Sequence, residues 1–531
     1  MNRRWLCLPL PLVLLSASCN AQTPTGAISV KIDAGKNRHP ISPLVYGVSF
    51  AGTGGPGFRN PLNRFGGNST TRYNWKLNAD NRAQDWFFQS IADADPTPGG
   101  VVEKFLKETQ AAGSVPMITI PCIGWVAKVA RDRGKLWSFS VKKYGSQEKT
   151  DAQWTPDAGN GKKPDGKEVT GNDPTDANMA VTPDYFRPWV KSLAARVPYF
   201  MLDNEPGIWQ GTHRDVTPNG ETLDSLFGKL RSTAAMIRAE APKAQICGPE
   251  EWGWTGFLYS GADSQWAGKN GWNVNNLPDR KAHGGIDAMP YLLSQFAAEE
   301  KKTGKRLLDV FTLHFYPQGG EFGDDVSSAT QARRNRSTRA LWDVNYKDES
   351  WINDTVKLIP RMKTWRDASY PGTKLGLTEY SWGAEKHMNG ATAQADILGI
   401  LGREGLDLAN RWTSPGPDTP TYKAFQLFRN ADGKGLGFGD ASVSCAAPSP
   451  DDLSAFAATD TKTGALTIVL VAKAESGSRT VALNLAGFLP GGRAKVYQLA
   501  NGKLGEAGTG STAGQVTVPC PSVTLLVIPK R

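Results

Sequence analysis

Two glutamates, Glu205 and Glu379, each follow an apolar run and precede a turn or an aromatic residue. Glu205 belongs to Asp-Asn-Glu-Pro at 203–206, and Glu379 belongs to Leu-Thr-Glu-Tyr at 377–380. An apolar run that leads directly into an acid is typical of a buried barrel strand that delivers a side chain to the mouth of a cleft. Two such carboxyl groups are the minimum equipment for hydrolysing a glycosidic bond.

The surroundings of the two acids favour different roles for them. A general acid must keep its proton near neutral pH, and a partly apolar seat at a strand end offers Glu205 that environment. Asn204 could hydrogen-bond a sugar hydroxyl beside the cleaved bond. Glu379 would stay ionised as the nucleophile, with Tyr380 supporting it or lining the floor of the cleft. The alternatives are a helix-capping turn around Glu205 and an ordinary ion pair for Glu379.

Polar and aromatic residues at the ends of other predicted strands could build sugar-binding subsites. Arg64 and Asn68 end the second predicted strand, and His314 and Tyr316 end the sixth. Trp412 ends the eighth and is a natural platform for stacking on a sugar ring. Five further tryptophans are candidates for stacking or for the core: Trp125, Trp209, Trp252, Trp254 and Trp382.

The elements that must position these residues are apolar runs alternating with amphipathic segments. The eight predicted strands span residues 45–50, 62–68, 115–122, 199–206, 245–250, 308–317, 375–382 and 406–412. Helical patterns begin at residue 101 and cover 226–241, 289–302, 351–365 and 392–403, and each stops before a glycine or proline. The alternation predicts an α/β fold, a (β/α)8 TIM barrel.

The pattern changes near residue 431, after which helical periodicity is absent. Short apolar runs separated by turn residues cover 453–459, 466–472, 480–485, 494–499 and 523–529. These runs predict an all-β sandwich appended to the barrel. We therefore divide the chain into a signal peptide (1–21), an N-terminal strand joining the sandwich (22–40), the barrel (41–430) and the sandwich (431–531).

Two long polar insertions, 142–178 and 259–285, follow the third and fifth predicted strands. Long loops after barrel strands lie on the catalytic face, so we expect both to shape the cleft. Loose surface segments are the alternative.

The N-terminus is typical of an export signal, with two arginines, a short apolar core at 5–15 and small residues before Ala21. Cleavage there would give a secreted or periplasmic protein. The alternative is a surface lipoprotein, because Cys19 resembles an imperfect lipidation site. The apolar core is too short to span a membrane in the mature protein, and no other segment is predicted to cross one.

The composition excludes several classes of protein. With 39% hydrophobic and 21% charged residues, the chain of 531 residues is not globally disordered. Its net charge of +10 comes from short scattered basic runs, so no nucleic-acid partner is expected. Of the cysteines outside the signal, Cys122 and Cys247 are expected as buried thiols, and export would permit a disulfide between Cys445 and Cys520. No Cys-His cluster has metal-ligand spacing.

Several motifs in the same order resemble glycoside hydrolase family 44, the secreted bacterial endoglucanases and xyloglucanases. They are Tyr-Gly-Val-Ser-Phe at 46–50, Asn-Arg-Phe-Gly-Gly-Asn at 63–68, Leu-Asp-Asn-Glu-Pro at 202–206, and the segments 308–317, 339–351, 377–380 and 399–404. The resemblance implies a retaining hydrolase with a barrel and a β-sandwich, in which Glu205 is the acid/base and Glu379 the nucleophile, roughly 5–5.5 Å apart. Trp382 occupies a position at which the resemblance predicts a smaller polar residue or a tyrosine. This difference bears on the fine specificity of the enzyme and not on its chemistry.

The sequence thus predicts a secreted, monomeric, retaining endo-β-1,4-glucanase acting on cellulose-type β-glucan, xyloglucan or both. Catalysis would need no cofactor. Family relatives can hold a structural metal ion, although no ligand set in this chain is strong enough to name. Two alternatives remain: a xylanase or mannanase of the same mechanism, and a catalytically inactive polysaccharide-binding surface protein. The presence of both acids speaks against the second.

Overall fold

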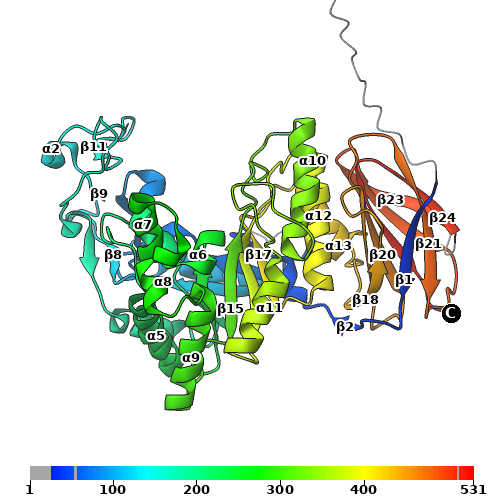
Figure 1. Cartoon of the computed structure of the whole chain (residues 1–531), viewed down its shortest axis with the longest axis horizontal. Coiled ribbons are helices and arrows are strands. Elements are labelled where there is room, and N and C mark those ends of the chain that lie inside the picture. The colour runs from blue at the N-terminus through cyan, green and yellow to red at the C-terminus, as the bar shows by residue number, and fades with distance from the viewer. Residues whose placement is uncertain (1–25, 53–56, 511–513) are drawn as a thin grey trace, which may run out of the picture.

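The computed structural model describes residues 26–52, 57–510 and 514–531. The predicted signal peptide, with Cys19, lies outside the described residues. A helix-covered barrel and a β-sheet domain lie side by side, and the sheet domain occupies the right of Figure 1. Within the described ranges, no helix is long and apolar enough to cross a membrane.

Eight parallel strands form a closed barrel, in which the last strand pairs with the first. They are β3 (Gly47–Ser49), β4 (Leu62–Phe65), β7 (Val115–Ile120), β13 (Tyr199–Leu202), β14 (Gln245–Glu251), β15 (Val310–Phe315), β16 (Lys374–Tyr380) and β17 (Leu408–Arg411). Each overlaps one of the predicted apolar runs, so the predicted barrel is confirmed.

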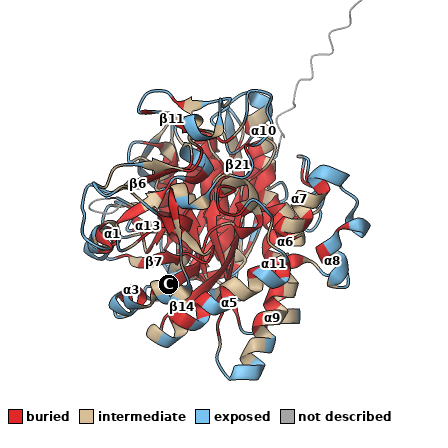
Figure 2. Cartoon of the chain, turned by 90° about the vertical axis from the view of Figure 1, so that its left-hand side faces the viewer, coloured by how far each residue is buried: buried red, intermediate tan, exposed pale blue. Residues whose placement is uncertain are grey.

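The barrel strands are apolar because both of their faces are buried, as in other parallel barrels. Figure 2 shows the buried strands surrounded by helices whose outer sides are exposed. Six inward side chains, one from each of six strands, fill the interior near the strand starts: Leu62, Met117, Met201, Cys247, Val310 and Leu408. Because these side chains fill the barrel near the strand starts, polar groups can gather inside it only near the strand ends.

Four predicted helices are confirmed: α1 (Gly100–Ala111), α5 (Leu223–Glu240), α9 (Ala288–Thr303) and α12 (Met388–Arg403). The predicted start of a fifth was wrong, because α11 (Leu358–Ser369) begins at Leu358 and not at Trp351. Asn353 and Lys357 adopt left-handed backbone conformations that interrupt a helix.

The insertion at 142–178 is ordered by local pairing. It contains α2 (Val141–Tyr144, which starts one residue earlier) and a small antiparallel pair, β10 (Thr150–Asp151) with β11 (Thr155–Gly159). Its last residue begins β12 (Asn178–Ala180), which pairs with β8 (Trp125–Ala127).

The insertion at 259–285 was expected to be a loop, and that expectation was wrong. It contains two helices, α7 (Gly261–Asn270) and α8 (Pro278–Ala282). Ser260 caps α7 by accepting a hydrogen bond from the backbone of Asp263 at 3.1 Å. The carboxylate of Asp263 in turn accepts from two backbone N–H groups at the start of α8. The polar residues that suggested a loop are therefore helix caps.

The C-terminal domain is one continuous sheet in the order β23-β22-β25-β20-β19-β18-β1-β21-β24, which folds around its own apolar core. Its strands are β1 (Ile28–Asp33), β18 (Ala441–Ala446), β19 (Leu453–Thr459), β20 (Leu466–Ala472), β21 (Ser478–Ala486), β22 (Ala494–Ala500), β23 (Lys503–Gly510), β24 (Gly514–Pro519) and β25 (Ser522–Ile528). The N-terminal β1 lies between β18 and β21. Cys445 and Cys520 are free thiols, so the disulfide considered from the sequence is not formed.

The barrel and the sheet domain share an apolar interface along α12. Phe456 of β19 and Val469 of β20 belong to the same buried cluster as Ile397 of α12. A Cβ atom at Gly399 would overlap the ring of Phe456, so the helix backbone lies directly against the sheet. This close packing explains why nearly all of α12 is buried.

Candidate active site

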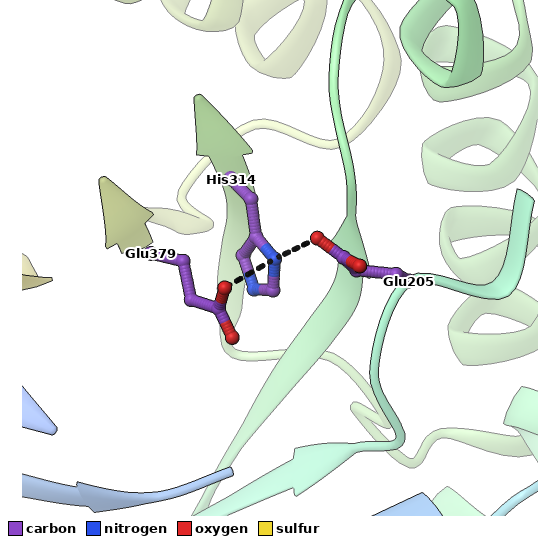
Figure 3. A group of neighbouring side chains, drawn as sticks. All are labelled: Glu205, His314 and Glu379. Atoms are coloured by element: carbon purple, nitrogen blue, oxygen red, sulfur yellow. Dashed lines mark hydrogen bonds and ion pairs between the residues drawn. The ribbon is translucent and has the colours of Figure 1, made fainter. Parts of the chain in front are cut away.

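Three side chains from neighbouring strand ends meet at the mouth of the barrel. Glu205 follows β13, His314 lies in β15, and Glu379 lies in β16 (Figure 3). His314 Nδ1 lies 3.0 Å from Glu205 Oε1 and 3.6 Å from Glu379 Oε2. A carboxylate oxygen of each glutamate and a ring nitrogen of His314 all lie within 4.8 Å of one another.

An irregularity in β16 directs Glu379 into the barrel. Leu375 and Leu377 belong to the outer apolar cluster, and strict alternation would place Glu379 on their side. The pairing with β15 shifts register, so that Leu377 pairs with Leu313 and Glu379 pairs with His314. Thr378 is the extra residue of this bulge, which reverses the alternation and turns Glu379 inward.

A buried carboxylate fixes the sharp turn that carries Glu205. Asp203 and Glu205 both have left-handed backbones, with φ of 66° and 47°. The Asp203 carboxylate accepts hydrogen bonds from the backbone N–H groups of Cys122, Ile123 and Asn204, and burial raises its pKa to about 6. Glu205 precedes the short 3-10 helix η6 (Pro206–Ile208), but its side chain makes no capping bond and remains available at the cleft.

Glu379 is held by a cation and a hydroxyl. Arg64 of β4 places Nη1 2.7 Å from Glu379 Oε1, and Tyr316 donates its hydroxyl to Oε2 at 2.9 Å. Burial alone would lower the pKa of Arg64, but the carboxylates of Glu379 and Glu250 outweigh it and raise that pKa. Burial and the charge of Glu379 raise the pKa of the Tyr316 hydroxyl, so it remains a donor.

The pKa values of Glu205 and His314 are both raised, so both groups favour their protonated forms. Burial raises the pKa of Glu205, the hydrogen bond from His314 opposes this shift, and the negative charge of Glu379 reinforces it. Burial would lower the pKa of His314, but contacts with Glu379, Glu205 and Glu250 raise it to about 9. His314 is therefore a cation at neutral pH, and Glu205 is the carboxyl suited to carrying a proton.

Sequence reasoning missed two buried acids at the end of β14. Glu250 accepts hydrogen bonds from Thr312 and, at 3.2 Å, from His314, and Arg64 lies 3.5 Å away. Glu251 accepts from the backbone of Gly207 at 3.2 Å, and burial raises its pKa to about 7. Both end an apolar run, the same signal that singled out Glu205 and Glu379.

A cavity of about 640 Å³ lies beyond the end of β4, and neither Glu205 nor Glu379 is among the residues that line it. Asn204 joins it to the acids, because its side chain accepts from Arg64 at 2.9 Å and donates to Asn68 at 3.1 Å. Asn68 and the half-buried Trp412, both predicted to bind substrate, line the cavity. A Cβ at Gly67 would overlap the Trp412 ring, so only glycine permits this approach.

Two residues on the wall of this cavity were not singled out from the sequence. Asp85 and Trp86 line it, and Trp86 is 38% exposed. The Trp86 ring lies 5.5 Å from that of Trp154, which belongs to the insertion at 142–178 and is 58% exposed. These two rings provide an apolar surface beyond the cavity, at which a longer sugar chain could stack.

Three residues expected to bind substrate lie elsewhere, and those expectations are corrected. Tyr380 faces α12, where its buried hydroxyl accepts from Gln394 at 3.1 Å, because the bulge turns Glu379 and not Tyr380 inward. Trp382 is buried and donates to Ser337 at 2.9 Å.

The third, Trp209, is fully buried and donates to the backbone carbonyl of Asn204 at 2.9 Å, so it supports the turn from behind. Trp125 is half-buried in β8 against the apolar core and is not among the residues lining the cavity.

The side chains of Glu205, His314 and Glu379 form the one group in the described part of the chain whose spacing could hold a metal ion. The chemistry of the group does not fit a divalent cation. Arg64 already neutralises Glu379 at 2.7 Å, and both ring nitrogens of His314 face carboxylates. Hydrolysis by two carboxyl groups needs no metal.

Several known proteins are similar to this chain in sequence and in fold. The sequence pattern of glycoside hydrolase family 44 matches residues 79–319. Endoglucanase A of Paenibacillus lautus is 29% identical over 491 residues, which cover 88% of this chain and 66% of that protein. The chain therefore spans just under two thirds of the length of this curated relative.

Two solved structures extend the similarity over almost the whole chain. CelM2, a bifunctional glucanase-xylanase from a metagenome library, is 50% identical with a TM-score of 0.92, over 95% of this chain and 99% of that one. A Paenibacillus polymyxa xyloglucanase from family 44, solved with xyloglucan, is 27% identical with a TM-score of 0.77, over 95% of this chain and 100% of that one. These similarities show that the chain belongs to glycoside hydrolase family 44.

Proposed function

We propose that this protein is a retaining endo-β-1,4-glucanase that hydrolyses cellulose-type β-glucan and xyloglucan. The observation that carries the proposal is the close approach of Glu205 and Glu379, whose carboxylate oxygens lie within 4.8 Å. Retaining glycosidases hold their carboxyl groups about 5–5.5 Å apart, whereas inverting enzymes need about 6.5–9.5 Å to admit a water molecule.

In the proposed first step, the ionised carboxylate of Glu379 attacks the anomeric carbon while Glu205 protonates the departing glycosidic oxygen. Arg64 and Tyr316 hold the two Glu379 oxygens, which fixes the direction of attack. In the second step, Glu205 takes a proton from water, and the resulting hydroxide displaces Glu379 from the sugar. The anomeric carbon is inverted twice, so the product keeps the configuration of the substrate.

The similarity to the xyloglucanase and to CelM2 supports a β-1,4-linked backbone as substrate. The cavity beside the acids, with Trp412 and Trp86 on its walls, supports binding of several sugar units. Xylan is the second candidate, because CelM2 is described as a bifunctional glucanase-xylanase. The intact pair of acids argues against an inactive binding protein.

The test is reducing-sugar release from carboxymethylcellulose, xyloglucan, xylan and mannan by the purified mature chain. We expect activity on the glucans and a loss of about 10²-fold or more in Glu205→Gln and in Glu379→Gln. Glu349→Gln is a matched control, because that partly exposed glutamate pairs with Arg336. Activity on xylan or mannan alone would replace the substrate assignment, and retained activity in both catalytic variants would refute the mechanism.

We infer export from the N-terminal sequence, and a monomer as the working form. Mass spectrometry of the mature N-terminus tests the first inference. A start after Ala21 indicates secretion, whereas a lipid-modified Cys19 indicates a surface lipoprotein. Light scattering tests the second inference, since a dimer would double the expected mass.

A further inference from the structure

A second cavity, of about 470 Å³, lies between the end of α13 (Pro420–Asn430) and the sheet domain. The helix follows β17 and returns toward the starts of the barrel strands, so its last turn lies at the end of the barrel opposite the two acids. Figure 1 shows α13 between the barrel and the sheet domain. None of the residues lining this cavity also lines the cavity beside the acids.

Three basic side chains line this cavity: Arg429 at the end of α13, Arg493 just before β22, and Lys495 within β22. Within the described ranges, none of the three forms an ion pair with a carboxylate, although many other surface cations do. The Nε atom of Arg429 is buried and has no hydrogen-bond partner. A buried donor without a partner is costly, and a ligand could satisfy it.

Asp460 is the one acid among the described residues that line this cavity, against three cations, and it forms no ion pair with them. Asp460 uses Oδ1 to accept hydrogen bonds from two backbone N–H groups of its own turn, at 2.9 and 2.7 Å. Arg59 is a further cation nearby and, after burial itself, helps to lower the pKa of Arg429. The cavity therefore carries an excess of positive charge that favours an anion.

Part of the remaining wall is apolar and restricts the kind of anion. The rings of Phe428 and Phe438 lie 5.4 Å apart in an edge-to-face arrangement, and Val527 lies on the sheet side. Phe438 and Val527 are half-buried, whereas Phe428 is buried behind them. A bare inorganic anion would leave Phe438 and Val527 in contact with water, and a neutral apolar compound would leave the cations unpaired. The volume lies within the range of about 300–1,000 Å³ that is usual for small-molecule sites.

We propose that this cavity, which we name the junction site (Phe428, Arg429, Phe438, Arg493 and Lys495), binds a carboxylate carried on an aromatic ring. The planar guanidinium of Arg429 matches a carboxylate, while the ring packs against Phe438 and Val527. Arg493 and Lys495 attract the anion at the entrance. The proposal does not depend on the polysaccharide substrate, because the site lies apart from Glu205 and Glu379.

Isothermal titration calorimetry with the full purified chain tests the junction site. Cinnamate supplies the carboxylate and the ring, cinnamamide the ring without charge, sulfate the charge without a ring, and glucuronate a carboxylate on a polar ring. We expect cinnamate to bind, and the other three to bind at least about tenfold more weakly.

Variants locate the binding and supply the controls. We expect Arg429→Gln, and the double variant Arg493→Gln with Lys495→Gln, each to weaken cinnamate binding by about tenfold or more. Lys503→Gln removes a charge from an exposed position of β23 outside the cavity, and should bind cinnamate like the unmodified chain. If Arg429→Gln lowers the melting temperature, the double variant decides, because both of its side chains are exposed.

Three results would overturn the proposal: no binding of cinnamate, binding of sulfate or glucuronate as tight as that of cinnamate, or binding that persists in the double variant. Polysaccharide hydrolysis by the double variant should equal that of the unmodified chain. A failure of the junction site is therefore distinguishable from a failure of the proposed catalytic function.

Discussion

Replacing Tyr316 by phenylalanine removes one hydroxyl from the site without changing the shape of the side chain. That hydroxyl donates to Glu379 Oε2 at 2.9 Å, and His314 Nδ1 lies farther from the same oxygen, at 3.6 Å. A hydrogen bond to a charged group contributes about 1.5–3 kcal/mol, which corresponds to a loss of about 10- to 100-fold in kcat/KM if the bond orients the attacking carboxylate.

Tyr380→Phe is the matched control. The two tyrosines lie in neighbouring segments, Tyr316 half-buried and Tyr380 fully buried. The hydroxyl of Tyr380 accepts from Gln394 of α12, whereas that of Tyr316 donates to Glu379. We expect kcat/KM of Tyr380→Phe to stay within about twofold of the unmodified enzyme, with a loss of stability of about 1 kcal/mol.

The assay is the initial rate of reducing-sugar release from xyloglucan and carboxymethylcellulose, with melting temperatures of both variants. The fall in Tyr316→Phe should appear mainly in kcat, because an oriented nucleophile matters most in the transition state. Equal losses in the two variants, or full activity in Tyr316→Phe, would refute the assignment of Tyr316 to the site and of Tyr380 to the helix interface.

Three further predictions concern stability. Lys473 is buried and places Nζ 2.7 Å from Asp396 Oδ2. Lys473→Met should lower the free energy of unfolding, measured in urea, by about 3–5 kcal/mol, because it leaves the charge of Asp396 uncompensated. Adding Asp396→Leu removes that charge and should recover most of the lost stability. Gly399→Ala should lower the free energy of unfolding by about 1–3 kcal/mol, because the added Cβ overlaps Phe456, whereas alanine usually stabilises a helix relative to glycine. Adding Phe456→Leu should relieve the overlap. An unchanged melting temperature in Gly399→Ala would contradict this prediction. The pKa of His314 is raised to about 9 from an unfolded value near 6.5. Protonated His314 therefore stabilises the folded protein fully below about pH 6.5, and this contribution is lost as pH rises through about 9. The melting temperature should fall over that interval, and less steeply in His314→Gln.

The barrel could be predicted from the sequence because each parallel strand is buried on both faces and therefore appears as a continuous apolar run. Three strands of the sheet domain, β18, β23 and β24, were not predicted. Most residues of β23 (Lys503–Gly510) are exposed, and several are glycines, so the strand has no apolar periodicity. Helices α7 and α8 were missed because the polar residues that cap them also resemble a loop.

The location of the catalytic candidates was predicted from strand ends, but the direction of their side chains was not. Alternation along β16 places Gly376 inside the barrel against Leu408, so a regular strand would also turn Thr378 and Tyr380 inward and Glu379 outward. The bulge at Thr378 reverses this, and β14 contains a similar register shift at Glu250. Composition cannot reveal a bulge, because it depends on the pairing of two strands. The bulge that turns Tyr380 away from the site and the register shift at Glu250 bring His314, Glu250 and Glu379 together. The strands therefore depart from regular alternation at the residues that form the site.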